Sequence, residues 1–218
     1  MYTVIELSYI ASAVLFIFGL KMLGKPATAV RGNKVSAVGM LIAVVATLLY
    51  EGMDYKWILL GRAIGGVIGT VAAVRVPMTS MPEFVALFNG TGGLASLLVG
   101  WAEYNTFLNT PGGTLELVPV IAIYLAVLIG GVPFTGSMIA YAKLAERIDG
   151  RPVLYKGQQI VNGVLLALLL FCGVVYIAGP GAALAQPLFY LAVLLSLVLG
   201  VLVTIPIGGA DMPVVISL

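Results

Sequence analysis

The chain has 218 residues, of which 61% are hydrophobic and only 9% are charged, and its formal net charge is +2. Soluble domains contain about 25% charged residues, so this composition excludes an ordinary soluble globule and indicates a protein that crosses a membrane several times. The sequence contains no His and a single Cys, Cys172, which argues against a bound metal ion. The positive charge lies in connections between apolar stretches, so it does not indicate nucleic-acid binding.

Seven apolar stretches reach or approach the length of about 20 residues that a helix needs to cross a bilayer. They are Val4–Leu23, Ser36–Tyr50, Trp57–Val74, Met81–Trp101, Leu117–Ala142, Ile160–Ala178 and Leu188–Gly208. Because the runs are continuous and do not alternate with a period of two, they predict helices rather than barrel strands. We therefore expect an all-α transmembrane bundle of seven full spans, with an eighth beginning at Met212, as one domain over residues 1–218.

Positive charge divides unevenly between the two ends of these spans. Of the eleven Lys and Arg residues, nine lie at or in the first, third and fifth connections: Lys21, Lys25, Arg31, Lys34, Arg75, Lys143, Arg147, Arg151 and Lys156. Lys56 lies in the second connection and Arg62 within a span. Since cytoplasmic connections collect Lys and Arg, we expect the loops Gly24–Val35 and Ala145–Gln159 to be cytoplasmic and the N-terminus to lie outside.

Two further patterns concern helix packing and internal repetition. Gly61, Gly65 and Gly69 recur every four residues in the third stretch, a spacing that predicts close helix contact. The segment from Ser80 to Leu87 resembles the segment from Asp211 to Leu218, since both read Met-Pro after a polar residue. Both would start a span from the same side, with Pro in the first turn, which indicates a parallel duplication or a chance match.

Polar residues inside apolar spans are costly and often functional. Asn89 lies about two turns into the fourth stretch, and Ser137 lies in the second half of the fifth. Asn89 either holds a water molecule or only joins two helices. The Ser137 hydroxyl either contributes to a polar path or bonds back to its own helix. Pro133 removes a helix hydrogen bond nearby.

Two carboxylates lie at the expected cytoplasmic mouth of the bundle. Glu83 falls in the first turn of the fourth stretch, where a helix N-terminus favours negative charge. Asp211 precedes Met212 and Pro213 in the position of an N-cap. With no His in the chain, a proton path must use waters, Asn, Ser, Thr and carboxylates, or a His from another chain.

Four segments resemble the beta subunit of proton-translocating nicotinamide nucleotide transhydrogenase. They are Met81–Gly90, Phe134–Ser137, Gly157–Asn162 and Gly208–Leu218. The resemblance implies a membrane enzyme that couples hydride transfer between NAD(H) and NADP(H) to proton movement. It implies that this chain is the proton-conducting membrane part, with no cofactor bound in it, and that the NADP(H)-binding domain and about two spans would follow Leu218. It also implies a bacterial inner-membrane location, an alpha-subunit partner with an NAD(H)-binding domain, and two copies of the complex in the lipid bilayer.

The resemblance also implies roles for individual residues. Asn89 stands where some members have a proton-relay His, so this chain departs from that pattern and Asn89 itself cannot titrate. In members that lack this His, a His on an alpha-subunit helix is thought to replace it. Ser137 matches a Ser associated with the channel, and Asp211 matches a motif Asp near the NADP(H)-binding domain. Thr135 and Glu83 match by motif alone.

Two other functions stay open from the residues alone. A secondary transporter is disfavoured, because no inverted repeat and few midplane charges are present. A purely structural membrane subunit is compatible with the low charge but not with a polar Asn89 inside a span. A continuation of the chain into a dinucleotide-binding domain would favour the transhydrogenase function over both.

Overall fold

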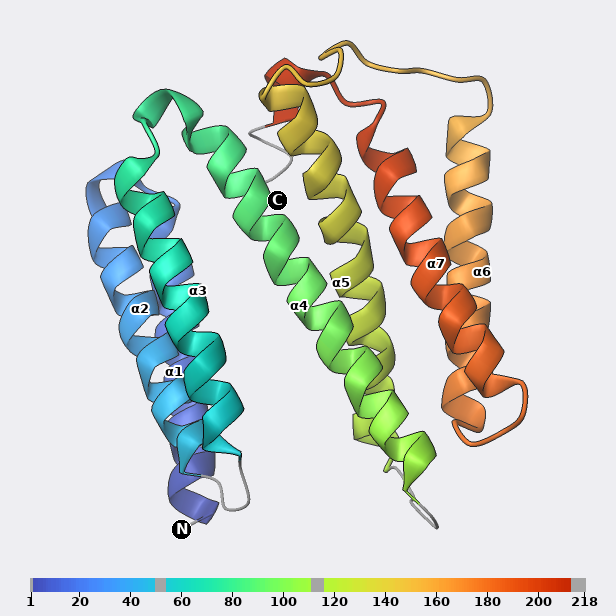
Figure 1. Ribbon diagram of the computed structural model, residues 1–218, viewed down its shortest axis with the longest axis horizontal. Helices are drawn as coiled ribbons and strands as arrows, with labels where there is room; N and C mark the ends of the chain where they lie inside the picture. The colour runs from blue at the N-terminus through green and yellow to red at the C-terminus, as the bar shows by residue number, and fades with distance from the viewer. Residues whose placement is uncertain (1, 50–53, 111–115, 213–218) are drawn as a thin grey trace. The chain divides into compact units, whose positions relative to one another are not determined.

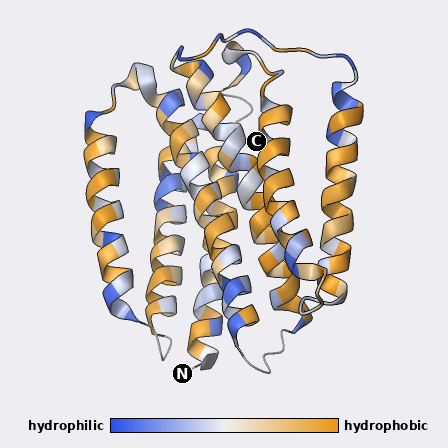
Figure 2. Ribbon diagram, turned by 45° about the vertical axis from the view of Figure 1, so that its right-hand side comes forward, coloured by the Kyte–Doolittle hydropathy of each residue, from blue (hydrophilic) through white to orange (hydrophobic). Residues whose placement is uncertain are grey.

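The computed structural model describes residues 2–49, 54–110 and 116–212, and it divides the chain into two units, Met1–Ala73 and Val74–Leu218. Over these residues the secondary structure is helical, and seven helices are long and apolar enough to cross a membrane. Hydrophobic residues dominate the lengths of these helices (Figure 2). The predicted all-α architecture with seven spans is confirmed, whereas the eighth span would begin at Met212 and continue outside the described residues.

The first unit contains α1 (Tyr2–Leu23), α2 (Pro26–Leu48) and most of α3 (Tyr55–Arg75). The helix α2 begins ten residues before the predicted start at Ser36, so the predicted Gly24–Val35 loop is wrong. Pro26 is tolerated in the first turn of a helix. Gly32, in the second turn, lets α2 lie close to α1, because a Cβ there would be 2.7 Å from the Gly19 carbonyl oxygen.

The glycines that recur every four residues in α3 contact no other helix among the described residues. Gly61, Gly65 and Gly69 of α3 have no atom within 4 Å of an added Cβ, and no described residue of α3 is buried. The contact between α1 and α2 instead uses Gly19, Gly32 and a hydrogen bond of 2.6 Å from Ser12 Oγ to the carbonyl oxygen of Gly39.

The second unit contains η1 (Met78–Ser80), α4 (Met81–Asn109), α5 (Leu117–Leu144), α6 (Gln158–Ala178), α7 (Ala185–Thr204) and η2 (Gly209–Asp211). The central helix is α5: α4 packs along one side of it, α7 along the other, and α6 lies against α7 (Figure 1). The starts of α4 and α6 and the ends of α5 and α7 meet at one end of this unit, which we call the Lys143 end.

Neighbouring glycines let two helices approach α5 at the same level. A Cβ added at Gly130 would lie 2.6 Å from the Gly93 carbonyl oxygen of α4. A Cβ added at Gly131 would lie 2.9 Å from Ser196 Cβ of α7. Such distances leave no room for a side chain at Gly130 or Gly131, so α4 and α7 pack directly against the backbone of α5. Pro133 lies within α5 without ending it.

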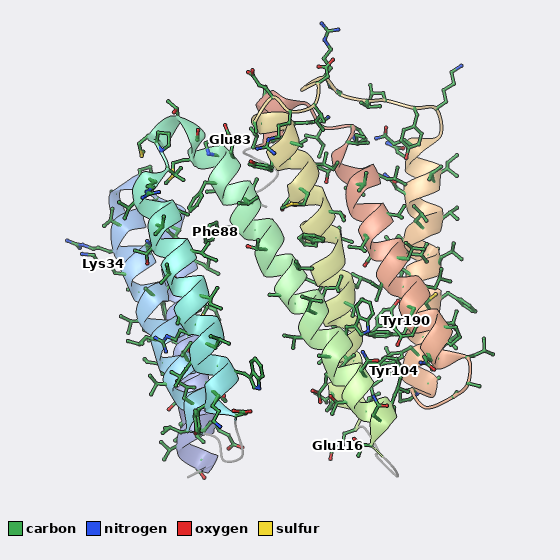
Figure 3. The ribbon with its side chains drawn as sticks, in the orientation of Figure 1. Lys34, Glu83, Phe88, Tyr104, Glu116 and Tyr190 are labelled. Atoms are coloured by element: carbon green, nitrogen blue, oxygen red, sulfur yellow. The ribbon has the colours of Figure 1, made fainter. Side chains whose placement is uncertain are left out.

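Two helices end four or more residues away from the predicted C-terminal residue. The helix α4 runs eight residues beyond Trp101, because its polar extension finds partners: Tyr104 Oη donates to the Pro180 carbonyl oxygen at 3.2 Å, and Tyr190 Oη donates to Asn105 Oδ1 at 3.3 Å (Figure 3). The helix α7 ends at Thr204 rather than Gly208, because Pro206 has no N–H to continue the helical hydrogen bonds.

The Gly130 contact generates a prediction of stability. Gly130→Ala should destabilise the second unit by about 1–3 kcal/mol, because the methyl group would overlap the α4 backbone. Gly92→Ala is the matched control on α4, since an added Cβ there meets nothing within 4 Å. The detergent-solubilised protein is heated, and the fraction that stays folded is measured by size-exclusion chromatography. The midpoint temperature of unfolding should be lower for Gly130→Ala alone. Equal midpoints for the two variants would contradict the close contact.

Candidate functional site

Asn89 and Ser137, the two polar residues that the sequence singled out within apolar spans, are in contact. Asn89 Nδ2 of α4 donates a hydrogen bond of 2.9 Å to Ser137 Oγ of α5. Ser137 is only 4% exposed, so its hydroxyl lies within the helix interface and does not bond back to its own helix as the simpler interpretation of the sequence required. This pair forms the polar part of an otherwise apolar seam between α4 and α5.

Small residues bring these two polar groups together. Gly90, which follows Asn89, is buried, and a Cβ added to it would lie 3.1 Å from Ser137 Cβ and 2.6 Å from Met138 Cε. The helix backbones come closer still one turn later, at Gly93, where an added Cβ would lie 2.7 Å from a backbone carbonyl oxygen of α5. If α4 and α5 were farther apart, the side chain of Asn89 would be too short to reach Ser137.

Asn89 is only partly enclosed, and the residue is exposed in the second unit. Only part of its hydrogen-bonding capacity is used, since one amide N–H is donated to Ser137 while an amide has two donor hydrogens and an acceptor oxygen. The remaining positions lie at the surface of the second unit, where another helix can cover them.

Thr135 does not join this pair. Its hydroxyl donates to the Leu197 carbonyl oxygen of α7 at 2.7 Å. Residues two apart on a helix point to different faces, so Thr135 faces α7 whereas Ser137 faces α4. The family resemblance placed Thr135 and Ser137 in one motif and gave no sign that they face different helices. The helical period of about 3.6 residues does predict this difference.

Met212 connects this seam to the Lys143 end of the unit. It is fully buried and packs with Ala86 of α4 and Ala140 of α5. Ala86 lies three residues before Asn89, and Ala140 lies three residues after Ser137. Residues three apart share a helix face, so Met212 packs one turn from the Asn89–Ser137 hydrogen bond.

The two predicted carboxylates lie at this same end. Glu83 is in the first turn of α4, as expected (Figure 3). Asp211 is the exposed last residue of η2, and its backbone N–H donates to the Gly208 carbonyl oxygen at 3.0 Å. The helix that it was predicted to cap would continue through Pro213–Leu218, outside the described residues.

The predicted internal repeat has a structural counterpart up to Met212. Pro77 (φ −69°, ψ 154°) and Gly208 (φ −69°, ψ 149°) each precede a three-residue 3₁₀ helix. Met81 (φ −58°, ψ −40°) and Met212 (φ −57°, ψ −40°) each follow one with nearly identical torsion angles. Two Met-Pro segments thus follow the same turn, and both reach the Lys143 end of the second unit.

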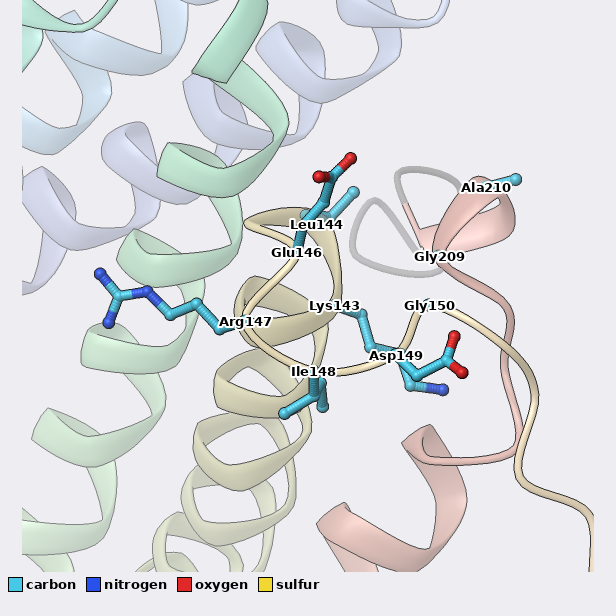
Figure 4. A pocket seen from close by; sticks show the side chains of 9 residues that line it. All are labelled: Lys143, Leu144, Glu146, Arg147, Ile148, Asp149, Gly150, Gly209 and Ala210. Atoms are coloured by element: carbon cyan, nitrogen blue, oxygen red, sulfur yellow. The ribbon is translucent and has the colours of Figure 1, made fainter.

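One residue at this end was misjudged from the sequence. Lys143 was counted only as a charge of the fifth connection, but it lies in the last turn of α5 and is 3% exposed. Its ammonium group donates to the carbonyl oxygens of Ile205 (2.6 Å), Ile207 (2.8 Å) and Arg151 (3.1 Å). It also lines a pocket of about 610 Å³ with Glu146, Asp149 and Gly209 among the other residues (Figure 4). Its place directly after an apolar stretch gave no signal that separates it from an exposed flanking Lys.

The described residues offer no obvious metal centre. Within residues 2–49, 54–110 and 116–212, no three Cys, Asp or Glu side chains lie close enough together to hold an ion. Cys172 is buried and free. The groups at the seam are an amide and hydroxyls, which can bind and orient water or relay a proton along it but cannot hold a charge themselves.

Comparisons with known proteins place these features in a family. A family model described as "NAD(P) transhydrogenase beta subunit" matches residues 5–218. Two curated relatives from Rhodospirillum rubrum, one of them assigned to a particular strain, are named "NAD(P) transhydrogenase subunit beta" and are each 39% identical over 215 residues. The matched region is 97% of this chain but 46% of each relative, so the chain spans about half the length of these relatives.

Proposed function

The chain belongs to the NAD(P) transhydrogenase beta subunit family, of which it covers the membrane portion, and from this premise we propose that it forms the proton-conducting part of the enzyme. It would couple proton movement across the membrane to hydride transfer between NAD(H) and NADP(H). That hydride transfer would take place in soluble domains outside this chain.

The observation that carries the proposal is the hydrogen bond between Asn89 and Ser137, which joins the two apolar helices α4 and α5. Polar groups at membrane depth are expensive and commonly mark ion or proton pathways. The amide can donate to and accept from water at its exposed positions, and the Ser137 hydroxyl behind it can do the same. Neither group titrates, so the pair orients water while the proton is held elsewhere.

The exposed side of Asn89 is evidence that a helix from another chain covers it. An amide left facing lipid would keep unmet hydrogen-bonding groups at a cost of several kcal/mol. We infer that a helix of the alpha subunit covers this face and supplies the titrating group, which this chain cannot supply as a His because it has none. We further propose that the complex contains two copies of each subunit and lies in a bacterial inner membrane.

The Lys143 end is proposed to face the cytoplasm and the NADP(H)-binding domain. Basic residues concentrate at the connections there, which is the pattern of cytoplasmic loops. Glu83 and Asp211 both lie at this end, and Met212 extends from it to the seam. Within the proposal the two carboxylates lie at the mouth of the proton path, and Thr135 holds α5 against α7 beside it.

Replacing the amide tests the pathway. Asn89→Leu should reduce proton-coupled transhydrogenation by at least about tenfold, equivalent to about 1.4 kcal/mol in activation free energy, while enzyme abundance stays constant. The measurement is proton uptake with reverse transhydrogenation by the full complex in vesicles. Thr91→Val is the matched control, because the Thr91 hydroxyl bonds only to the Phe88 carbonyl oxygen of its own helix, at 2.9 Å. Full coupled pumping by Asn89→Leu would remove Asn89 from the pathway.

Orientation is tested separately by labelling. Lys156→Cys, in the exposed α5–α6 connection, should react only with thiol reagents that reach the cytoplasm, and so should Asn33→Cys, near the start of α2. Cys172 is a suitable background thiol because it is buried. Modification of either position by a membrane-impermeant reagent added outside intact cells would reverse the proposed topology.

A further inference from the structure

Lys143 presents an unusual environment for a charged side chain. It is 3% exposed, and each of its three hydrogen-bond acceptors is a backbone carbonyl oxygen rather than a carboxylate. Three donated bonds require the ammonium form, since that form alone has three N–H groups. A positive charge removed from water is expensive unless it is fully hydrogen-bonded, and here all three donors are used.

The acceptors of Lys143 show what it holds in place. Ile205 is the C-cap of α7, where the last carbonyl groups of the helix lack partners and attract a cation. Ile207 lies two residues further, in the connector between α7 and η2, and Arg151 lies in the α5–α6 connection. One side chain at the end of α5 thus joins two segments that are more than 50 residues apart.

Two backbone hydrogen bonds reinforce this junction. Val153 N–H donates to the Ile205 carbonyl oxygen at 3.3 Å, and Gly209 N–H donates to the Gly150 carbonyl oxygen at 2.8 Å. We call the set formed by Lys143, residues 150–153 and residues 205–209 the clasp. It ends three residues before Met212, which packs one turn from the Asn89–Ser137 bond.

We propose that Lys143 is a positioning residue for energy coupling. It holds the α7–η2 connector against α5, so that Asp211 stays at the mouth while Met212 stays on the seam. A movement imposed on Asp211 then reaches Ala86 and Ala140 instead of being absorbed by a loose connector. This inference rests on the proposed function, because it assigns Lys143 a part in the coupling of that same seam.

Neutralising Lys143 is the first test. In the full complex in vesicles, Lys143→Met should keep the length of the side chain but leave three carbonyl groups without their donor. We expect proton-coupled transhydrogenation to fall by at least about tenfold, while uncoupled hydride exchange stays within about twofold. Lys156→Met is the matched control, because Lys156 is an exposed Lys of the same connection and should leave both rates unchanged. An unchanged ratio of coupled to uncoupled rates in Lys143→Met would overturn the proposal.

A second variant weakens the clasp without removing the charge. Gly209→Pro deletes the N–H that donates to Gly150 and directs the ring Cδ at the same carbonyl oxygen, so it opens this contact while leaving Lys143 in place. The backbone on either side accepts the change, because Pro is tolerated at the first position of a helical turn and Gly208 already has the extended conformation favoured before Pro. Gly209→Ala is its control, because an added Cβ makes contacts of 3.5 Å or longer. Gly209→Pro should lower coupling severalfold and Gly209→Ala should not. Equal coupling in the two variants would contradict the clasp even if Lys143→Met failed to assemble.

A disulfide distinguishes positioning from a direct role of the charge. Added Cβ atoms at Gly150 and Gly209 would lie within 4.0 Å of the opposite Cα atom, so the pair Gly150→Cys and Gly209→Cys can be oxidised to close the clasp covalently. In the Lys143→Met background, oxidation should restore coupling and reduction should abolish it again. Coupling that stays lost after the disulfide has formed would show that the charge itself is required and would overturn the positioning role.

These outcomes separate the clasp from the proposed pathway. If Asn89→Leu is harmless while Lys143→Met uncouples the enzyme, the seam proposal fails and the clasp stands. If Asn89→Leu abolishes pumping while Lys143→Met and Gly209→Pro leave it intact, the clasp fails and the pathway stands.

Discussion

The close approach of α4 to α5 is the constraint on which the rest of the second unit depends. Gly90, Gly93 and Gly130 remove the side chains that would separate the two helices, and only then can the short Asn89 side chain reach Ser137. Because a membrane offers no hydrophobic gain for packing two helices together, contact depends on such close backbone fit and on hydrogen bonds between helices. The polar seam and the packing therefore have the same cause.

At the Lys143 end, a hydrogen bond between helices again satisfies backbone groups that lack a partner within their own helix. The last carbonyl groups of α7 have no partner within the helix, and Pro206 prevents the chain from continuing as a helix. Lys143 supplies the missing donors from α5. The solution also fixes where the chain re-enters the bundle, since Met212 lies only a few residues beyond the carbonyl groups that Lys143 binds. Packing at the seam and capping at the mouth are thereby joined through one connector.

The sequence predicted what depends on local chemistry and missed what depends on distant partners. Apolar length located seven helices, and the motif resemblance led to the family that the comparisons confirm. The early start of α2 was missed because Arg31 and Lys34 look like loop residues, although they sit exposed on a helix whose Gly32 faces α1. The four-residue glycine spacing in α3 meets no partner among the described residues. Lys143 could not be distinguished from a flanking charge, because its partners lie more than 60 residues away at Ile205 and Ile207.

In the proposed mechanism, events at the mouth are transmitted to the Asn89–Ser137 seam, and Asp211 is where that transmission begins. The most direct measurement is the ratio of proton-coupled reverse transhydrogenation to uncoupled hydride exchange in vesicles containing the full complex with Asp211→Asn. This change keeps an amide that can still cap a helix and removes the charge. The account predicts an assembled complex in which the coupled rate falls while the uncoupled rate persists. An unchanged ratio, at unchanged abundance, would show that Asp211 serves only as a cap and would contradict the account.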